Sequence, residues 1–137
     1  MKGALVEGAE AALALGELDK AEQLLAIPES LDPGQRMPYL GAQAARLRAR
    51  FDGTRGSHDQ VAERFRAAAA LSREFGFLLH LAVTQLEHAE WLTGRRRAED
   101  ARALLEEARE TFERLQARPW LERLAAAQAA RPAEIPA

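Results

Sequence analysis

The sequence contains no cysteine, few aromatic residues and no long apolar run. Without cysteine the chain forms no disulfide, performs no thiol catalysis and holds no cysteine-ligated zinc or iron–sulfur centre. No apolar run approaches the roughly 20 residues that a membrane-spanning helix needs. The first residues lack a cleavable signal pattern, because Glu7 and Glu10 interrupt them. We therefore expect a cytoplasmic protein without a membrane partner.

The chain also lacks an excess of basic residues, since its formal net charge is −2 and its pI is about 6.0. A general nucleic-acid binder normally has a basic surface, so we expect no nucleic-acid binding by this segment. The phosphate-binding motif G-x-x-x-x-G-K-[ST] and the metal-binding motif H-E-x-x-H are both absent. No nucleophile with an adjacent base stands out. These absences predict a protein that is not an enzyme and that uses neither a cofactor nor a metal ion.

Alanine and leucine are abundant. The length of 137 residues suits one domain. Valine and isoleucine are scarce, which favours helices over sheet. Apolar residues recur at helical spacing, and we expect seven helices. Their ranges are 3–15, 17–30, 35–52, 58–75, 77–93, 97–116 and 119–130. Ser57 is the expected N-cap of the fourth helix, and Gly16, Gly56 and Gly94 are expected in turns that follow helices.

A repeat of 40 residues runs through the chain. At each step a small residue is followed, four positions later, by a large one. The small residues are Ala21, Val61 and Ala101, and the large residues are Leu25, Phe65 and Leu105. The small residue lets two helices approach, and the large one fills the space one turn further on. This pattern predicts one antiparallel helix pair in each repeat.

The segment "ARPWLERL" marks the last joint of this array. Pro119 interrupts the preceding helix and suits the first turn of a new one. Trp120, Leu121 and Leu124 can then fold back on the last pair as a closing helix, which a repeat array needs at its end. The alternative is that Trp120 is simply one aromatic residue in the core of a bundle.

The stretch "GELDKAEQLL", with Gly16, Ala21, Leu25 and Pro33, resembles the second half of a tetratricopeptide repeat (TPR). The chain departs from that family in its period, 40 rather than 34 residues. The resemblance implies an all-α, TPR-like α-solenoid of antiparallel helix pairs with a C-terminal capping helix. The expected domain covers residues 1–131, with repeats at 1–34, 35–76 and 77–118, a capping helix at 119–130 and a disordered tail at 132–137.

The stretch "AEDARALLEEARETFERLQARPWLERL" resembles the C-terminal repeat region of large bacterial signalling proteins. Such proteins carry an ATPase domain, often with an adenylate or guanylate cyclase domain or a LuxR-type DNA-binding domain. The resemblance implies a non-catalytic interaction or regulatory module that is a fragment of a larger protein. Its partner would be a protein or peptide, or other domains of the parent chain, and a homo-oligomer is a further option. The alternative function is a small-ligand sensor that controls an attached catalytic or DNA-binding domain.

One helix offers a candidate partner-binding surface. Five polar or aromatic residues lie within about a third of the circumference of the expected helix 77–93, on the face opposite its leucines. They are His80, Thr84, Glu87, His88 and Trp91. A tryptophan beside titratable groups, facing away from the core, is typical of a peptide-binding or oligomerising surface. The more conservative interpretation, which we favour, is that Trp91 covers a neighbouring repeat and the histidines are bystanders.

Three consecutive arginines, Arg95, Arg96 and Arg97, precede the next helix. The helix dipole disfavours cations at a helix start, so this triplet is a candidate site for an acidic partner or an anionic ligand. The simpler interpretation is that the three side chains are solvated.

Overall fold

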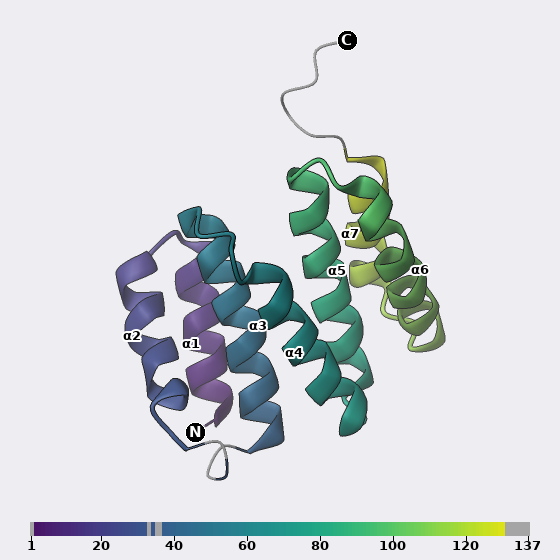
Figure 1. Cartoon of the computed structure of the whole chain (residues 1–137). Coiled ribbons are helices and arrows are strands. Elements are labelled where there is room, and N and C mark those ends of the chain that lie inside the picture. The colour runs from purple at the N-terminus through teal and green to yellow at the C-terminus, as the bar shows by residue number, and fades with distance from the viewer. Residues whose placement is uncertain (1, 33, 35–36, 131–137) are drawn as a thin grey trace. The chain divides into compact units, whose positions relative to one another are not determined.

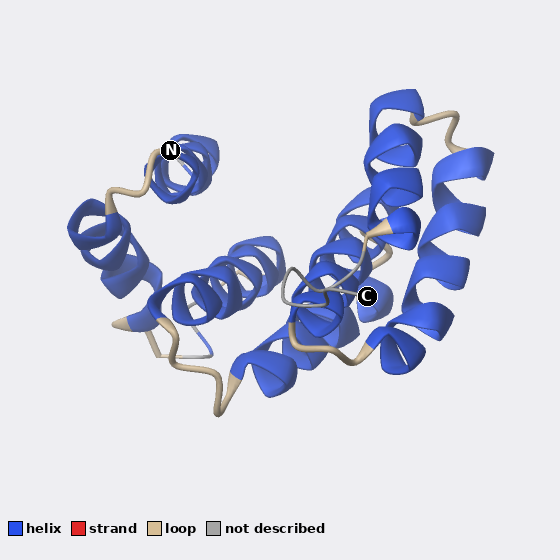
Figure 2. Cartoon of the chain, turned by 90° about the horizontal axis from the view of Figure 1, so that it is seen from above, coloured by secondary structure: helices blue, strands red, loops and turns tan. Residues whose placement is uncertain are grey.

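The described residues form helices and contain no β-strand. The computed structural model describes residues 2–32, 34 and 37–130, and Figures 1 and 2 show helices joined by loops. The seven helices are α1 (Lys2–Ala14), α2 (Leu18–Glu29), α3 (Pro38–Arg55), α4 (Val61–Glu74), α5 (Leu78–Gly94), α6 (Ala98–Arg114) and α7 (Arg118–Ala129). The prediction of an all-α fold is therefore confirmed. No helix of this described part is both long and apolar enough to cross a membrane.

The chain divides into two compact units, at residues 1–76 and 77–137. In the first unit α1 packs against α2 and α3, α2 packs against α3, and α3 packs against α4. In the second unit α5 packs against α6 and α7, and α6 packs against α7. The single-domain limits 1–131 stay a prediction, and the tail 132–137 lies outside the described residues.

The small and large residues of the 40-residue register lie in the second helix of each pair, and all of them are buried. Ala21, Val61 and Ala101 have an exposed fraction of 0%. The large residues one turn later, Leu25, Phe65 and Leu105, are also buried. Both positions are thus buried in all three repeats. We infer that the same combination, a small contact residue and a large filling residue, packs the two helices of each pair together.

The turns between helices repeat as closely as the helices do. The left-handed residues are Gly16, Gly56, Gly76, Arg96 and Gln116, with φ between 54° and 87°. At Gly56 the turn is closed by hydrogen bonds from the Gly56 N–H to the Gly53 carbonyl and from the Ser57 N–H to the Asp52 carbonyl. This is the Schellman pattern, which satisfies carbonyl groups at the end of a helix.

Two expectations about these turns are wrong. Gly94 is the last residue of α5, and the left-handed position falls two residues later on Arg96. Ser57 is not the N-cap of α4, because that helix starts at Val61 after Gln60 and the Ser57 N–H closes the preceding turn. The hydrogen bonds of the turn, rather than the place of the nearest glycine or serine, therefore fix these boundaries.

The proline-rich connection after α2 differs from the expected ranges by a few residues. Pro28 lies within the last turn of α2, which ends at Glu29, one residue before the expected end at 30. The following helix starts at Pro38, at its first position, three residues later than expected. Pro33, expected in a turn, lies outside the described residues.

The closing helix packs as the sequence predicts. Leu124 belongs to the apolar core of the second unit, and Trp120 and Leu121 pack against that core. The Trp120 ring stacks on Phe112 of α6, with 5.9 Å between ring centroids. Glu122, on the outer side of α7, is exposed. These residues therefore fold back on the α5–α6 pair, and the role of α7 as the closing helix of a repeat array stays a prediction.

Substitutions at two equivalent left-handed positions, 56 and 96, should have opposite effects on stability. Gly56→Ala should lower the free energy of unfolding by about 1 kcal/mol, because a Cβ is disfavoured at positive φ. Arg96→Gly should raise it by about 0.5 kcal/mol, because relief of that strain exceeds the entropy that glycine adds to the unfolded chain. A Cβ at Gly56 would meet nothing within 4 Å, so backbone conformation alone decides the sign.

Urea unfolding followed by circular dichroism measures both changes, with the slope of the transition as the check on two-state behaviour. An unchanged midpoint for Gly56→Ala would show that this turn is not held in the left-handed conformation.

Candidate interaction site

The five candidate residues on α5 are less exposed than the sequence suggests. Thr84, Glu87 and His88 are buried, with exposed fractions of 1%, 4% and 7%. The prediction that their face of the helix points away from the core is therefore wrong for these three residues. The Thr84 hydroxyl donates to the His80 carbonyl at 2.7 Å, which satisfies it within the helix. Whether the set binds a partner stays a prediction.

Trp91 is half-buried and packs against the core of the second unit. Its ring centroid lies 6.2 Å from that of His88, with the planes tilted by 38°. This packing supports the more conservative interpretation, in which Trp91 acts chiefly as an apolar cover. The part of the ring that stays exposed is the part that could meet a partner.

An ion pair that the sequence analysis missed joins α7 to this face of α5. The Arg123 guanidinium donates two hydrogen bonds to the Glu90 carboxylate, at 2.8 and 2.6 Å. It also lies 3.8 Å from the buried Glu87 carboxylate and over the Trp120 ring, 5.4 Å from its centroid. Glu87 is therefore buried beside a cation, which lowers the cost of taking a carboxylate out of water.

The first unit has a matching arrangement around Glu10, forty positions before Arg50 and eighty before Glu90. Arg46 of α3 lies 3.2 Å from the Glu10 carboxylate, and Arg50 lies 3.4 Å from it. The buried Arg46 also donates to the Gln43 side-chain carbonyl at 3.0 Å. In both units a carboxylate on the first helix is thus bound by arginine from the third helix. The 40-residue register could have located the two glutamates, but it gives no sign of the arginines, which occupy different positions.

A second arginine cluster binds α3 to α2 in the first unit. Arg48 donates two hydrogen bonds to Glu29, at 2.9 and 2.7 Å, and a third to Glu22. The pKa of Arg48 is raised above its ordinary value, chiefly by the hydrogen bonds to Glu29. Burial is the next largest effect, and it lowers the pKa. The Arg48 guanidinium lies over the Phe51 ring, 4.8 Å from its centroid. The cluster therefore fixes both a charge and an aromatic ring between α2 and α3.

The arginine triplet lies in the turn from α5 to α6 and is exposed. Arg97 precedes α6 and donates to Asp100 at 2.9 Å, so its charge is paired within the first turn of the helix. Arg96 holds the left-handed position. Of the eight candidates, these three arginines are the exposed residues.

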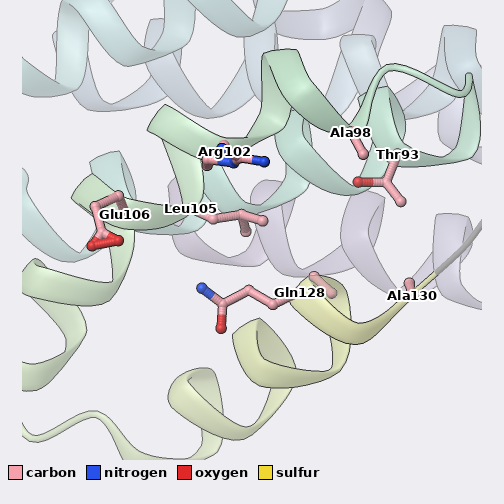
Figure 3. Close-up of a pocket in the computed structure, with 8 residues that line it drawn as sticks. Thr93, Ala98, Arg102, Leu105, Glu106, Gln128 and Ala130 are labelled. Atoms are coloured by element: carbon pink, nitrogen blue, oxygen red, sulfur yellow. The ribbon is translucent and has the colours of Figure 1, made fainter.

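Figure 3 shows a hollow between α6 and the end of α7. Its volume is about 270 Å³. Its apolar lining includes Leu105 and Ala127, and its polar lining includes Thr93, Arg102, Glu106 and Gln128. In the close-up Leu105 of α6 and Gln128 of α7 face each other across the hollow. This site was not predicted from the sequence, because small residues at these positions are typical of ordinary contacts between helices.

The described residues contain no group of three or more His, Asp or Glu side chains that could hold a metal ion. No family model, no curated protein and no solved structure matches the chain.

The α5–α7 ion pair yields a prediction about stability. Arg123→Met should lower the free energy of unfolding by about 1–2 kcal/mol, because it leaves the Glu87 and Glu90 carboxylates without this cation while keeping most of the apolar stem. The matched change Arg102→Met removes an exposed pair with Glu99 and should cost less than about 0.5 kcal/mol. Chemical denaturation of both variants checks the difference. Equal losses would mean that the Arg123 pair contributes no more than a surface contact.

Proposed function

We propose that this chain is a non-catalytic interaction module built of TPR-like helix pairs, and that it serves as a regulatory segment of a larger bacterial signalling protein. The observation that supports this proposal is the recurrence of one helix-pair design at an interval of 40 residues. Positions 21, 61 and 101 are equally buried, and positions 16, 56 and 96 are equally left-handed. Stacked helix pairs are a common means of presenting a surface to other proteins.

The alternative, a small-ligand sensor, would be favoured by an enclosed apolar pocket with converging polar groups. The apolar space among α1, α2 and α3, lined by residues such as Leu25 and Leu47, has a volume of only about 10 Å³. That is room for no more than about one water molecule. The larger hollow at α6–α7 is open and partly polar, which suits a side chain of a partner better than an enclosed effector.

The partner in this proposal is a protein or peptide, or another domain of the parent chain. The exposed arginine triplet favours an acidic surface on that partner. Charge of this kind raises the association rate and fixes orientation more than it raises affinity. The binding should therefore weaken as salt is added.

A triple variant tests the arginine surface. The change Arg95→Ser, Arg96→Gly and Arg97→Ser should abolish salt-sensitive, saturable capture of a partner by the immobilised chain, while leaving the fold intact. The control is Arg66→Ser, which removes another exposed arginine on α4. Quantitative crosslinking at 50 and 300 mM salt is the measurement. Capture that is equal for the triple variant and the control would contradict a role for the triplet.

Trp91→Ala separates packing from recognition on α5. Because the ring packs on the core, we expect a loss of about 2 kcal/mol in unfolding free energy. Partner binding per folded molecule should stay unchanged. Weaker binding at constant stability would instead assign Trp91 to the partner surface and contradict the packing interpretation.

A further inference from the structure

The first three helices and the last three are built on one register, eighty positions apart. Within its own unit, α1 packs on α2 and α3 as α5 packs on α6 and α7, and α2 packs on α3 as α6 packs on α7. Each residue of α5, α6 or α7 from Leu81 onward therefore has a counterpart eighty positions earlier. The comparison shows which space is filled in one set and open in the other.

In the first set the space between α2 and α3 is filled. The Phe51 ring is 2% exposed and belongs to the same core as Leu13 and Leu47. Leu18, at the start of α2, packs against that core. Arg48 covers the ring from its outer side and is held by two glutamates of α2.

In the second set the same space is left open. Smaller residues replace three of the leucines that fill it in the first set: Thr93 replaces Leu13, Ala98 replaces Leu18 and Ala127 replaces Leu47. α7 ends at Ala129, the counterpart of Ala49, whereas α3 continues to Arg55, and the counterpart of Phe51, position 131, is outside the described residues. The result is the hollow of about 270 Å³.

The charges beside this space also differ, because the hollow is lined by Arg102 and by Glu106, whose carboxylate accepts a hydrogen bond from Arg109. Glu22 and Glu29, which hold Arg48 in the first set, have Arg102 and Arg109 as counterparts. Gln128 stands in place of Arg48. Arg102 lines the hollow and is paired only with Glu99, at 2.9 Å, and its side chain is 76% exposed. Pairs this exposed contribute little, so an incoming carboxylate can replace Glu99 at small cost.

We infer that the hollow between α6 and α7 receives an aromatic side chain from a helical segment of a partner protein, and that a carboxylate one turn before that aromatic binds Arg102. The occupant thus reproduces what Phe51 and Arg48 do in the first set, with the charge inverted. A volume of about 270 Å³ falls below the roughly 300–1,000 Å³ of small-molecule pockets, which favours one side chain over a whole ligand. This inference rests on the proposed role as an interaction module, for which it names the partner's chemistry.

The chain itself supplies the probe. A fluorescein-labelled peptide of residues 44–55 carrying Arg48→Glu presents a glutamate three positions before phenylalanine. Titration with the full chain, followed by fluorescence anisotropy, should show saturable binding. The unchanged peptide places arginine against Arg102 and should bind at least tenfold more weakly. The same should hold for the Arg48→Glu peptide that also carries Phe51→Ala.

Two variants of the full chain test the two halves of the site. Ala98→Leu restores the leucine found at its counterpart Leu18, so it should block the hollow and weaken binding at least tenfold without loss of stability. Arg102→Glu should reverse the preference, so that the unchanged peptide binds better than the Arg48→Glu peptide. Arg66→Glu is the control for net charge and should change neither affinity by more than about twofold.

Several results would overturn the inference. Binding that is insensitive to Ala98→Leu places the peptide elsewhere. If the peptide binds only to a chain truncated after Ala130, the occupant of the hollow is the last segment of the chain itself. Self-association that Ala98→Leu abolishes assigns it to a second copy. If the peptide does not bind but the arginine-triplet variant still loses partner capture, this site is refuted. The proposed function as an interaction module is then still supported.

Discussion

The whole structure depends on how closely two helices can approach where a small side chain lies between them. At Ala21, Val61 and Ala101 nothing larger than valine separates the paired helices, and none of these residues has any exposed surface. Helix axes pack 8–10 Å apart, at a distance set by the side chains at the contact. A long side chain at these positions would force the pair apart and would expose the large apolar residue one turn further on. The small residue therefore sets the spacing that lets Leu25, Phe65 and Leu105 be buried.

Much of the architecture follows from local sequence because its causes are local. Helical periodicity predicts seven helices, and the ends of most differ by only a few residues from those expected. The break at Pro119 and the apolar residues after it predict that Trp120 packs on the last pair. The turn at Arg96 was not predicted, because Gly94 was expected to mark it. The 40-residue register, which aligns position 96 with Gly16 and Gly56, locates it correctly.

The candidate site was harder to predict than the fold for a physical reason. A helical projection assigns polar residues to the wet side of a helix, yet Glu87 is buried beside Arg123. A polar stripe can face another helix wherever that helix provides the opposite charge. The position of that charge depends on tertiary packing, since Arg123 meets α5 only after α7 folds back. The same holds for Arg46, which is buried against Glu10 of α1.

The hollow at α6–α7 shows how one backbone design can serve two purposes. An enclosed empty void of about 270 Å³ would cost about 6 kcal/mol at roughly 24 cal/mol per Å³, which is comparable to the whole stability of a small domain, about 5–15 kcal/mol. The hollow avoids that cost because it is open to solvent and is lined partly by polar side chains, among them Arg102 and Gln128. An aromatic ring that enters it removes the apolar surface of Leu105 and Ala127 from water, and each Å² so buried contributes about 25 cal/mol. In the first three helices, Phe51 of the chain itself supplies this free energy of apolar burial. In the last three helices, it is available to an aromatic side chain of a partner.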